Sequence, residues 1–546
     1  MKILCYSTVL CSILATTIVT AGEGNDPRMD KYDVQHYDLA VTFNLGEESL
    51  SGCVEMTARA ITPLDVCVLS ADKKTLTVDS VFGQTSRLSF STDSGSVAIR
   101  MASTILSGRQ FSLKVFYHAA SKFSGQYDDG GIYFTRSGHI ASSGEPQFAR
   151  RWWPCKDIPS DKATVSSHFT VPDSITVASN GLLQSVDRHN GLATYNWNTK
   201  YPISTYLVSV AAAHYVELHD TYHALNGKPM QMVYYVYPED SAKALSTFKD
   251  APDYLSFMSH TFCEYPFVDE KFGYAEVEGD LTMENQTICS IQNTIISSGN
   301  DRDLTVFHET AHHWFGDLIT TVNWHHTWLN EGFATYMEAL YAEHTGGKEA
   351  YQKRINRMMN VPLGFYRRSV VGQSDTAFWD SFGASVYFKG AIVLHMLRQV
   401  LGDSDFFASL RSYVNDPRFR YGNAGTGDFE KVCESVSRKN LHGFFQQWVY
   451  TSVDSLDRPV LRYRWKTAPS TNGVGLTLTI KQENTPHPVY TLKLPIEVHE
   501  KSGTSGFSVV DSLPEQSFQL IVDSAPDSIA IDPENTVFKL AVKDHP

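Results

Sequence analysis

The chain of 546 residues is 42% hydrophobic and 12% aromatic, a composition typical of an ordered globular protein that is too long for a single hydrophobic core. At this length we expect roughly two to four domains. The formal net charge of −14 leaves no basic excess to neutralise phosphates, which argues against a nucleic-acid partner. An acidic field instead suits substrates that carry a free amine.

Residues 1–21 are typical of a signal peptide. Lys2 precedes the apolar run Ile3–Val19, and cleavage after Ala21 would leave small residues at the −3 and −1 positions. We therefore expect an exported protein, in a periplasmic, extracellular or lumenal compartment. Serine and threonine residues dilute the apolar run, so an uncleaved membrane anchor is the weaker alternative. A membrane contact is expected only in that case.

From residue 22 to residue 238, hydrophobic and polar residues alternate in short segments that are separated by turn-forming residues. Residues 37–43, Tyr-Asp-Leu-Ala-Val-Thr-Phe, are one such strand-like segment. Asn226-Gly227 stands between two others and predicts a tight hairpin turn. The pattern indicates an N-terminal all-β domain over residues 22–238.

Six cysteines remain once the signal segment is set aside, too few for a disulfide scaffold in a chain of this length. Cys53 and Cys67 lie in consecutive strand-like segments, so a bridge between them is possible. Buried free thiols are the ordinary alternative. The sequence leaves both open.

After residue 238 the hydrophobic period changes to that of helices. Residues 242–262 read as one long helix, and residues 384–401 as a helix that is apolar nearly all round and therefore buried. Strand-like runs interrupt the helical pattern at 272–277 and at 283–288. We predict a mainly helical catalytic domain over residues 239–453.

Alternation returns in the remainder of the chain, residues 454–546. Residues 476–480, Leu-Thr-Leu-Thr-Ile, and residues 490–494, Tyr-Thr-Leu-Lys-Leu, are strand-like. We expect a small β-sandwich here. The fold class predicted for the whole chain is therefore multidomain α+β.

The helical region contains a pattern that predicts a metal site. Two histidines four residues apart, His308 and His312, present their imidazoles on one face of a helix. A catalytic zinc ion takes three protein ligands and keeps one position open, and Glu331 supplies the third ligand from the first turn of a following helix. Glu309 projects beside the pair, where it can act as a general base without being a ligand.

The five-residue pattern His-Glu-x-x-His alone is equally compatible with a charged surface helix. The downstream Glu331 is what favours the metal site. Three other histidines, His313, His325 and His326, are rejected as ligands. The first points about 100° away from the ligand face, and the other two precede the second helix.

These residues resemble the signature of the gluzincin zinc aminopeptidases, the family of membrane alanyl aminopeptidase and leukotriene hydrolase. Three further stretches resemble motifs of that family in the same order. They are Glu145-Pro146 ahead of Arg150–Asp157, Thr282-Met283-Glu284-Asn285, and Val386-Tyr387-Phe388-Lys389-Gly390-Ala391. The resemblance covers nearly the whole chain after the signal segment.

The resemblance implies an N-terminal β-saddle domain, a thermolysin-like catalytic domain and a C-terminal β-sandwich. It implies one Zn2+ ion per chain. It also implies that Glu145, Met283, Glu284 and Asn285 bind the substrate, with both glutamates holding its free α-amino group. Tyr387 matches the tyrosine that donates to the developing oxyanion. Leu281-Thr282 departs from the family's Gly-Ala, which puts the shape of the side-chain pocket in doubt.

The implied function is a zinc metallo-aminopeptidase that releases N-terminal residues from peptides by attack of a zinc-bound water. Its partners would be peptides with a free N-terminus. Epoxide hydrolysis, as in leukotriene hydrolase, and an inactive homologue that acts as a binding protein are the alternatives. The printed chain stops after the expected sandwich, whereas many relatives continue into a helical domain that roofs the site. From the sequence we expect a short, exported member with an open cleft; the oligomeric state is undetermined.

Overall fold

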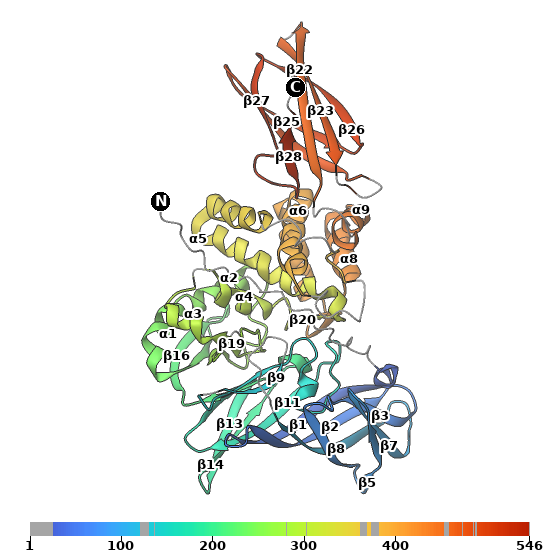
Figure 1. Ribbon diagram of the computed structural model, residues 1–546, viewed down its shortest axis with the longest axis vertical. Helices are drawn as coiled ribbons and strands as arrows, with labels where there is room; N and C mark the ends of the chain where they lie inside the picture. Colours follow the sequence, from blue (N-terminus) through green and yellow to red (C-terminus); the bar gives the residue numbers. More distant parts are fainter. Residues whose placement is uncertain are drawn as a thin grey trace.

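A computed structural model of the protein has three regions stacked along its long axis (Figure 1). A β-rich N-terminal region lies at one end, helices form the middle, and a second β-rich region lies at the other end. The structure describes residues 26–120, 130–135, 137–279, 281–301, 303–360, 369–372, 382–451, 458–471, 473–483, 485 and 489–544. The predicted signal segment 1–21 lies outside the described residues.

The N-terminal region is built on an eight-stranded sheet in the order β13-β14-β11-β1-β2-β8-β4-β5. Its strands are β1 (Tyr32–Asn44), β2 (Ser49–Ala60), β4 (Leu76–Phe82), β5 (Arg87–Leu88), β8 (Gln110–Ala120), β11 (Thr164–Pro172), β13 (Leu182–His189) and β14 (Leu192–Asn198). Burial alternates along β1 and β8, so one face packs on the core and the other faces solvent. The region is β-rich, in line with the strand-like pattern of its sequence.

Two smaller sheets complete this region, in the orders β12-β15-β10-β9 and β3-β7-β6. Their strands are β3 (Leu64–Ser70), β6 (Phe90–Thr92), β7 (Ser96–Ile105), β9 (Gly131–Phe134), β10 (Ile140–Ser143), β12 (Thr176–Ser179) and β15 (Val210–Ala213). Short 3-10 helices are η1 (Pro27–Lys31), η3 (Ala149–Arg151) and η4 (Thr205–Leu207). Cys53 lies in the large sheet and Cys67 in a small one, and both thiols are free.

A four-stranded sheet joins the N-terminal region to the helices. Its order is β16-β17-β18-β19, with β16 (Val216–His223), β17 (Pro229–Val236), β18 (Phe272–Val277) and β19 (Cys289–Gln292). The predicted hairpin at Asn226-Gly227 connects β16 to β17, with Gly227 at φ 80°. β17 pairs with β18 in parallel, so the boundary predicted at residue 238 falls within one sheet.

The two central strands of this joining sheet, β17 and β18, are buried on both faces where they pair, whereas the edge strand β16 is largely exposed. Tyr234 and Tyr274 point into the core of the helical region, while Tyr235 and Ala275 point into the core of the N-terminal region. Successive side chains of a strand point to opposite faces, so one sheet serves both cores. Segments that leave this sheet, including Met283, therefore lie at the seam between the two regions.

The middle region contains nine α-helices among the described residues. They are α1 (Ser241–Thr247), α2 (Ala251–Thr261), α3 (Asn293–Ser298), α4 (Thr305–His312), α5 (Glu331–Met359), α6 (Gly390–Leu401), α7 (Asp403–Asn415), α8 (Thr426–Ser437) and α9 (His442–Phe445). Shorter elements are η5 (Pro238–Asp240), η6 (Trp324–Leu329), the π-helical turns η8 (Ser385–Lys389) and η9 (Gln446–Tyr450), and strands β20 (Ile319–Thr321) and β21 (Gly422–Ala424).

Three local predictions in this region are corrected. The helix expected over 242–262 is two helices, because Pro252 at the start of α2 cannot continue a helix from the residues before it. The strand expected over 283–288 is a turn, which the Ile288 amide closes by donating to the Asn285 carbonyl (2.9 Å). The pair Gly346-Gly347 predicts the end of the second site helix, but that helix only breaks at Gly347 (φ 68°) and then resumes to Met359.

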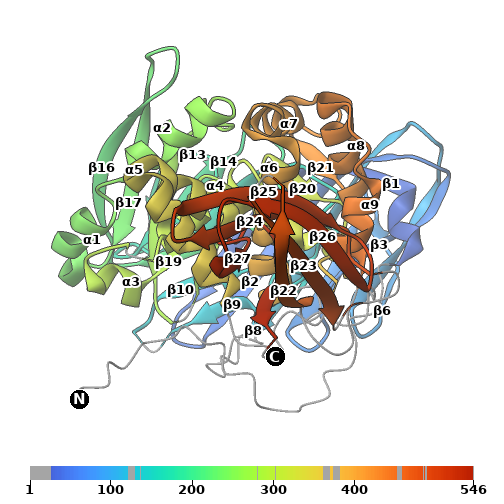
Figure 2. The same cartoon turned by 90° about the horizontal axis from the view of Figure 1, so that it is seen from above.

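The C-terminal region has two sheets, in the orders β26-β23-β22-β28 and β25-β24-β27. Their strands are β22 (Val460–Ser470), β23 (Gly473–Glu483), β24 (Leu492–Glu500), β25 (Gly503–Asp511), β26 (Glu515–Val522), β27 (Pro526–Ile531) and β28 (Leu540–Lys543). These strands lie over α5 and α6 (Figures 1 and 2). The loop between β27 and β28 docks there, with the Asn535 carbonyl 3.0 Å from His395 Nε2.

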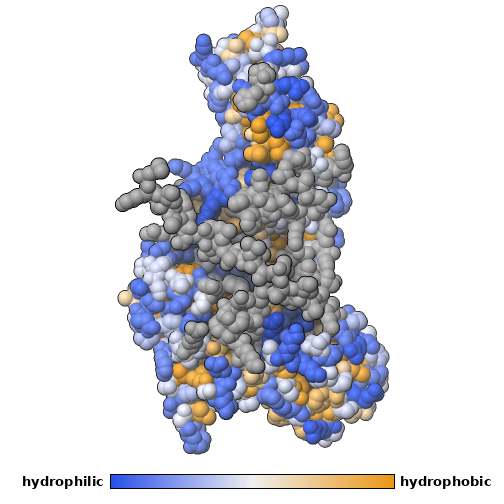
Figure 3. Space-filling view, in the orientation of Figure 1, coloured by the Kyte–Doolittle hydropathy of each residue, from blue (hydrophilic) through white to orange (hydrophobic). Residues whose placement is uncertain are grey.

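The described surface in Figure 3 is largely hydrophilic, and its hydrophobic residues form several separate groups. In the part of the chain that the structure describes, no helix combines the length and the apolarity needed to cross a bilayer.

Candidate functional site

The helix that carries the two predicted histidine ligands, α4, is fixed at its start by Asp301. The carboxylate of Asp301 accepts hydrogen bonds from the Val306 amide (3.0 Å) and the Phe307 amide (3.1 Å). These amides are among the first of the helix and have no partner within it. In the sequence, Asp301 and Asp303 offer N-cap chemistry ahead of this helix. Val306 and Phe307 are fully buried, which locks the helix against the core.

The predicted ligands converge on one point. His308 Nε2 lies 3.0 Å from His312 Nε2, and each lies 3.3 Å from Glu331 Oε2. Glu331 is the first residue of α5, as predicted. We call His308, His312 and Glu331 the metal triad. Two imidazoles and one carboxylate are a zinc donor set, and ligand atoms about 2.0–2.1 Å from a tetrahedral ion stand roughly 3.3 Å apart. The triad therefore fits zinc.

The outer nitrogens of both histidines are held by other groups. His308 Nδ1 lies 2.9 Å from Glu338 Oε1, and His312 Nδ1 lies 3.0 Å from the Phe315 carbonyl. Glu338 is held in turn by Arg354, whose Nε donates to Glu338 Oε2 (3.0 Å). With Nδ1 donating a proton outward, Nε2 of each ring is left as the metal-binding atom.

Sequence reasoning missed Glu338. A usable signal existed, because Glu338 follows Glu331 by seven residues and two turns of helix bring both carboxylates to one face of α5. That spacing alone does not say which of the acidic residues on α5 reaches a ligand.

The histidines and glutamates of the site shift one another's pKa values strongly. Burial alone would raise the pKa of Glu331, but the two adjacent histidines outweigh it and hold that pKa at about 2. Burial would likewise lower the pKa of His312, but Glu284 and Glu331 raise it to about 10. Protons and a metal ion compete for the same ring nitrogens, so metal binding must release protons.

Glu309, the predicted general base, is only 7% exposed and lies on the same helix. Its carboxylate falls within a group whose ligand atoms, with those of Glu284 and His312, all lie within 4.8 Å of one another. Burial raises the pKa of Glu309 to about 8. A cation bound nearby would lower it again. Glu309 is thus placed beside the metal triad without belonging to it.

A second group of acids meets the metal triad at Glu331. The carboxylates of Glu145, Glu284 and Glu331 have oxygens within 4.8 Å of one another, and we call these three residues the carboxylate cluster. Burial, with the neighbouring carboxylates adding to it, raises the pKa of Glu145 well above its ordinary value. Burial also raises the pKa of Glu284. Glu145 Oε1 is buried with no hydrogen-bond partner among the described residues. A cation in this space would relieve both the burial cost and the repulsion.

Met283 and Asn285 flank Glu284 and hold it in position. The Met283 amide and carbonyl pair with Ser290 (2.9 and 2.8 Å), and Asn285 Nδ2 donates to Ser290 Oγ (2.9 Å). Both residues are almost fully buried. Their direct contact with a substrate stays a prediction.

Tyr387 is brought to the metal triad by a π-helical turn at the start of the α6 helix. Its ring centroid lies 6.2 Å from that of His308, and the two rings are nearly parallel at 17°. α5 and α6 approach closely here because glycines meet: a Cβ added to Gly332 would lie 2.9 Å from the Gly390 Cα. π-helical turns are frequent at functional sites.

The three histidines rejected as ligands lie outside the triad. His313 is fully buried, with Nδ1 3.0 Å from the Tyr265 hydroxyl and Nε2 3.4 Å from Cys289 Sγ. His326 Nδ1 lies 2.8 Å from Thr426 Oγ1. None of the three, His325 included, belongs to a potential metal-holding group in the described part of the chain.

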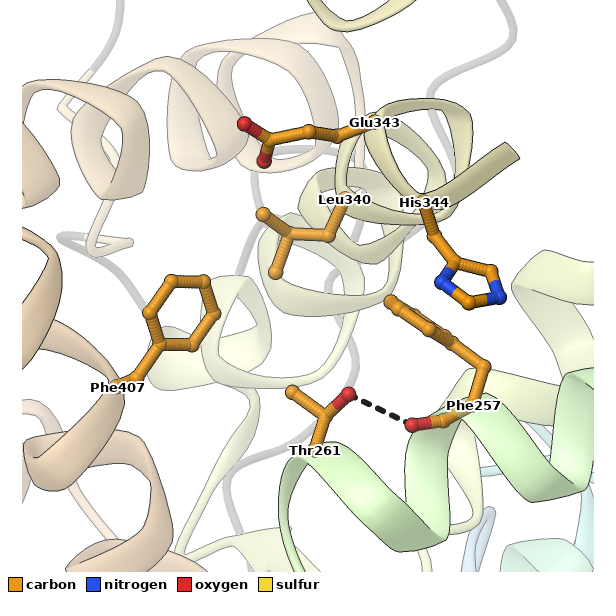
Figure 4. Close-up of a pocket in the computed structure, with 6 residues that line it drawn as sticks. All are labelled: Phe257, Thr261, Leu340, Glu343, His344 and Phe407. Carbon is orange, nitrogen blue, oxygen red and sulfur yellow. Dashed lines mark hydrogen bonds between the residues drawn. The ribbon is translucent and has the colours of Figure 1, made fainter. Parts of the chain in front are cut away.

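A surface pocket of about 210 Å³ lies away from this site (Figure 4). Its walls are Phe257, Thr261, Leu340, Glu343, His344 and Phe407. Its one acidic group, Glu343, already pairs with Arg398 (2.7 Å). The pocket contains no member of the metal triad or the carboxylate cluster.

Two family models match the chain. The peptidase M1 N-terminal domain matches residues 33–207, and the peptidase family M1 domain matches residues 253–448. Glutamyl aminopeptidase from Sus scrofa is 26% identical over 93% of this chain and 57% of its own length. This chain spans about half the length of the curated relatives that it matches.

Solved structures match as well. The M1 zinc metallopeptidase of Deinococcus radiodurans has a TM-score of 0.68 and 27% identity, over 77% of this chain and 94% of that one. A mutant of it was solved with a Tyr-Ser-Ala substrate. Legionella pneumophila aminopeptidase A, solved with aspartic acid, has a TM-score of 0.81 at 18% identity, over 94% of this chain and 60% of that one. At that identity the likeness concerns the fold.

Proposed function

The chain belongs to peptidase family M1, and on that premise we propose that it is a zinc aminopeptidase, a hydrolase that removes residues from the N-terminus of peptides. One observation carries the proposal. The carboxylate cluster shares Glu331 with the metal triad, so a bound ammonium group and a bound metal ion are neighbours. A peptide held by its α-amino group presents its first peptide bond to the metal.

Zinc is the cofactor that the triad fits, held by His308, His312 and Glu331. When bound, it polarises the scissile carbonyl and lowers the pKa of a water molecule. Glu309 takes a proton from the attacking water and passes it to the leaving amine. The Tyr387 hydroxyl donates a hydrogen bond to the oxygen on which negative charge develops.

The carboxylate cluster restricts cleavage to the first peptide bond, because it binds the free α-ammonium group of the substrate. An α-ammonium group is a small cation with three donors, and Glu145 and Glu284 offer carboxylate acceptors next to Glu331. The relative from Deinococcus radiodurans was solved with a tripeptide substrate, which supports peptides as the substrate class. An acetylated N-terminus has no charge and would leave these carboxylates unpaired.

A panel of aminoacyl fluorogenic substrates tests the proposal. The zinc-loaded protein should release the fluorophore from several of them, lose this activity with a chelator, and recover it when about one equivalent of zinc is returned. A protein that holds zinc and cleaves none of the panel would contradict the proposal and favour an inactive binding homologue.

Finer features of the fold and the location of the protein also belong to this proposal. We propose that the helical region has thermolysin-like architecture, that the N-terminal sheets form a saddle-like domain, and that the two C-terminal sheets form a β-sandwich. We further propose export, supported by the leader-like composition of residues 1–21. N-terminal sequencing of the protein recovered outside the cytoplasm should begin at Gly22.

A further inference from the structure

One segment of the N-terminal region reaches into the seam where the carboxylate cluster forms. This segment contains the 3-10 helix η4 (Thr205–Leu207), and its central residue, Tyr206, is only 1% exposed. The Tyr206 hydroxyl donates to Glu284 Oε1 (3.4 Å) and accepts from Asn330 Nδ2 (3.4 Å). Asn330 directly precedes Glu331. One hydroxyl group therefore links Glu284 to the residue that precedes Glu331.

The backbone of Tyr206 also contacts the segment that carries Glu145, the third residue of the cluster. A Cβ added to Gly144 would lie 2.2 Å from the Tyr206 carbonyl oxygen and 2.8 Å from the Tyr206 Cα. Only a glycine allows so close a backbone approach. Glu145 follows Gly144 directly, so the position of Tyr206 also fixes where Glu145 begins.

Tyr206 itself is held from two sides. Asn180, which is 4% exposed, donates through Nδ2 to the Leu207 carbonyl (3.0 Å) and to the Gln286 carbonyl (2.7 Å). This side chain ties the Tyr206 segment to the turn that carries Glu284. On the other side, the Tyr206 ring meets Trp324 edge to face, with centroids 5.1 Å apart. The first contact restrains the backbone next to Tyr206, and the second restrains its ring.

We propose that Tyr206 is a positioning residue that holds the carboxylate cluster at the spacing an α-ammonium group requires. This inference rests on the proposed function. The three carboxylates of the cluster repel one another, and the repulsion is strong because Glu284 and Glu331 are buried and little water screens their charges. A neutral donor can restrain Glu284 without neutralising it, whereas a lysine or arginine at this place would occupy the space of the substrate amine. A tyrosine fits that requirement.

The test measures amine recognition by binding rather than by turnover. Leucine hydroxamate and its counterpart without the amino group, 4-methylpentanoyl hydroxamate, would be titrated by calorimetry into the zinc-loaded protein and into Tyr206→Phe. The ratio of the two affinities reports the contribution of the amine alone. Loss of one long hydrogen bond to a charged group should weaken leucine hydroxamate by about 5- to 10-fold. Binding of the amine-free compound should change by less than about 2-fold.

Tyr195→Phe is the matched control. Tyr195 is also a buried tyrosine of the N-terminal region, but its hydroxyl donates to the Ile175 carbonyl (3.1 Å) and not to a residue of the cluster. This variant should leave the affinity ratio unchanged. Thermal unfolding of all three proteins verifies that each is folded; the phenylalanine ring keeps the contact with Trp324.

The proposal is overturned if Tyr206→Phe weakens both hydroxamates equally, since that is the result of general disorder, or if it changes neither. Failure of the proposed function is a separate result. A wild-type protein that cleaves no aminoacyl substrate would contradict the aminopeptidase assignment, while the affinity ratio would still report whether Tyr206 positions the cluster.

Discussion

The metal triad and the carboxylate cluster share Glu331 but are built in different ways. All three ligands of the triad come from α4 and the start of α5, within 24 consecutive residues. The other two carboxylates of the cluster come from elsewhere: Glu145 follows β10 in the N-terminal region, and Glu284 lies in a turn before β19. Helical geometry sets the first site, while the packing of two regions sets the second.

This difference separates chemistry from recognition. The ligands of the triad and the outer partners Glu338 and Phe315 all belong to the helical region. The cluster exists only when the N-terminal region is docked on the joining sheet. Changes in the triad should therefore affect metal binding or turnover, and changes in the seam should affect recognition of the N-terminus.

The largest effect is expected from Glu309→Gln. Loss of the general base should lower kcat/KM by about 10³-fold or more. Metal content, measured by elemental analysis, should stay at one zinc per chain, because Glu309 is not a ligand. Full activity in this variant would contradict the assigned base, and loss of the metal would contradict its separation from the triad.

Tyr387→Phe tests whether the Tyr387 hydroxyl stabilises the developing oxyanion. Removal of one donor to the developing oxyanion should lower kcat by about 10²- to 10³-fold with little change in KM. Steady-state kinetics on one aminoacyl substrate would measure both constants. An unchanged kcat would mean that Tyr387 only packs against His308.

Acid tests the junction between the helices and the C-terminal region, which lies outside both sites and contains a buried histidine. His395 joins the helices to the C-terminal region, and burial lowers its pKa to about 4. The unfolded chain, with a histidine pKa near 6.5, then binds a proton that the folded protein excludes. The free energy of unfolding should keep this contribution above pH 6.5 and lose about 3 kcal/mol of it by pH 4.

Urea denaturation at pH 7 and pH 4 would measure this loss in the free energy of unfolding, with His395→Gln as the comparison. The variant should lose about 3 kcal/mol less than the wild type over the same interval. Equal losses in both proteins would show that other groups govern the acid response.

The smallest of these effects concerns the outer partner of His308. Glu338→Ala should weaken zinc binding by about 10- to 100-fold, since the ring of His308 loses the acceptor that fixes its tautomer. Competition with a chromophoric chelator would give the affinity. Glu343→Ala is the control, because it removes a carboxylate of the same helix that pairs instead with Arg398. A similar loss in both variants would contradict a specific role for Glu338.

The same contrast explains what could be predicted from the sequence. The triad follows from the i, i+4 spacing of His308 and His312 and from one acidic residue at a helix start, which are local features. The β–α–β order of the regions follows from hydrophobic periodicity. Glu145, Glu284 and Tyr387 were assigned through a family resemblance, and the structure brings all three to the triad.

What escaped prediction depends on contacts between distant parts of the chain. The turn at residues 283–288 exists because Met283 pairs with Ser290, and hydrophobicity alone made it look like a strand. Tyr206 carries no local signal, since it is distinguished only by partners at Gly144, Glu284 and Asn330. The break before α2 could have been predicted from Pro252, which the long helical period concealed.

The central claim is that two helices form the metal site, and that a carboxylate cluster formed by two regions binds the substrate's α-amino group beside it. The most direct measurement uses two peptides that differ only by acetylation of the N-terminus, incubated with the zinc-loaded protein and followed by mass spectrometry. The account predicts that the free peptide loses residues one at a time from its N-terminus, while the acetylated peptide stays intact. Cleavage of the acetylated peptide at an internal bond, at a comparable rate, would contradict it.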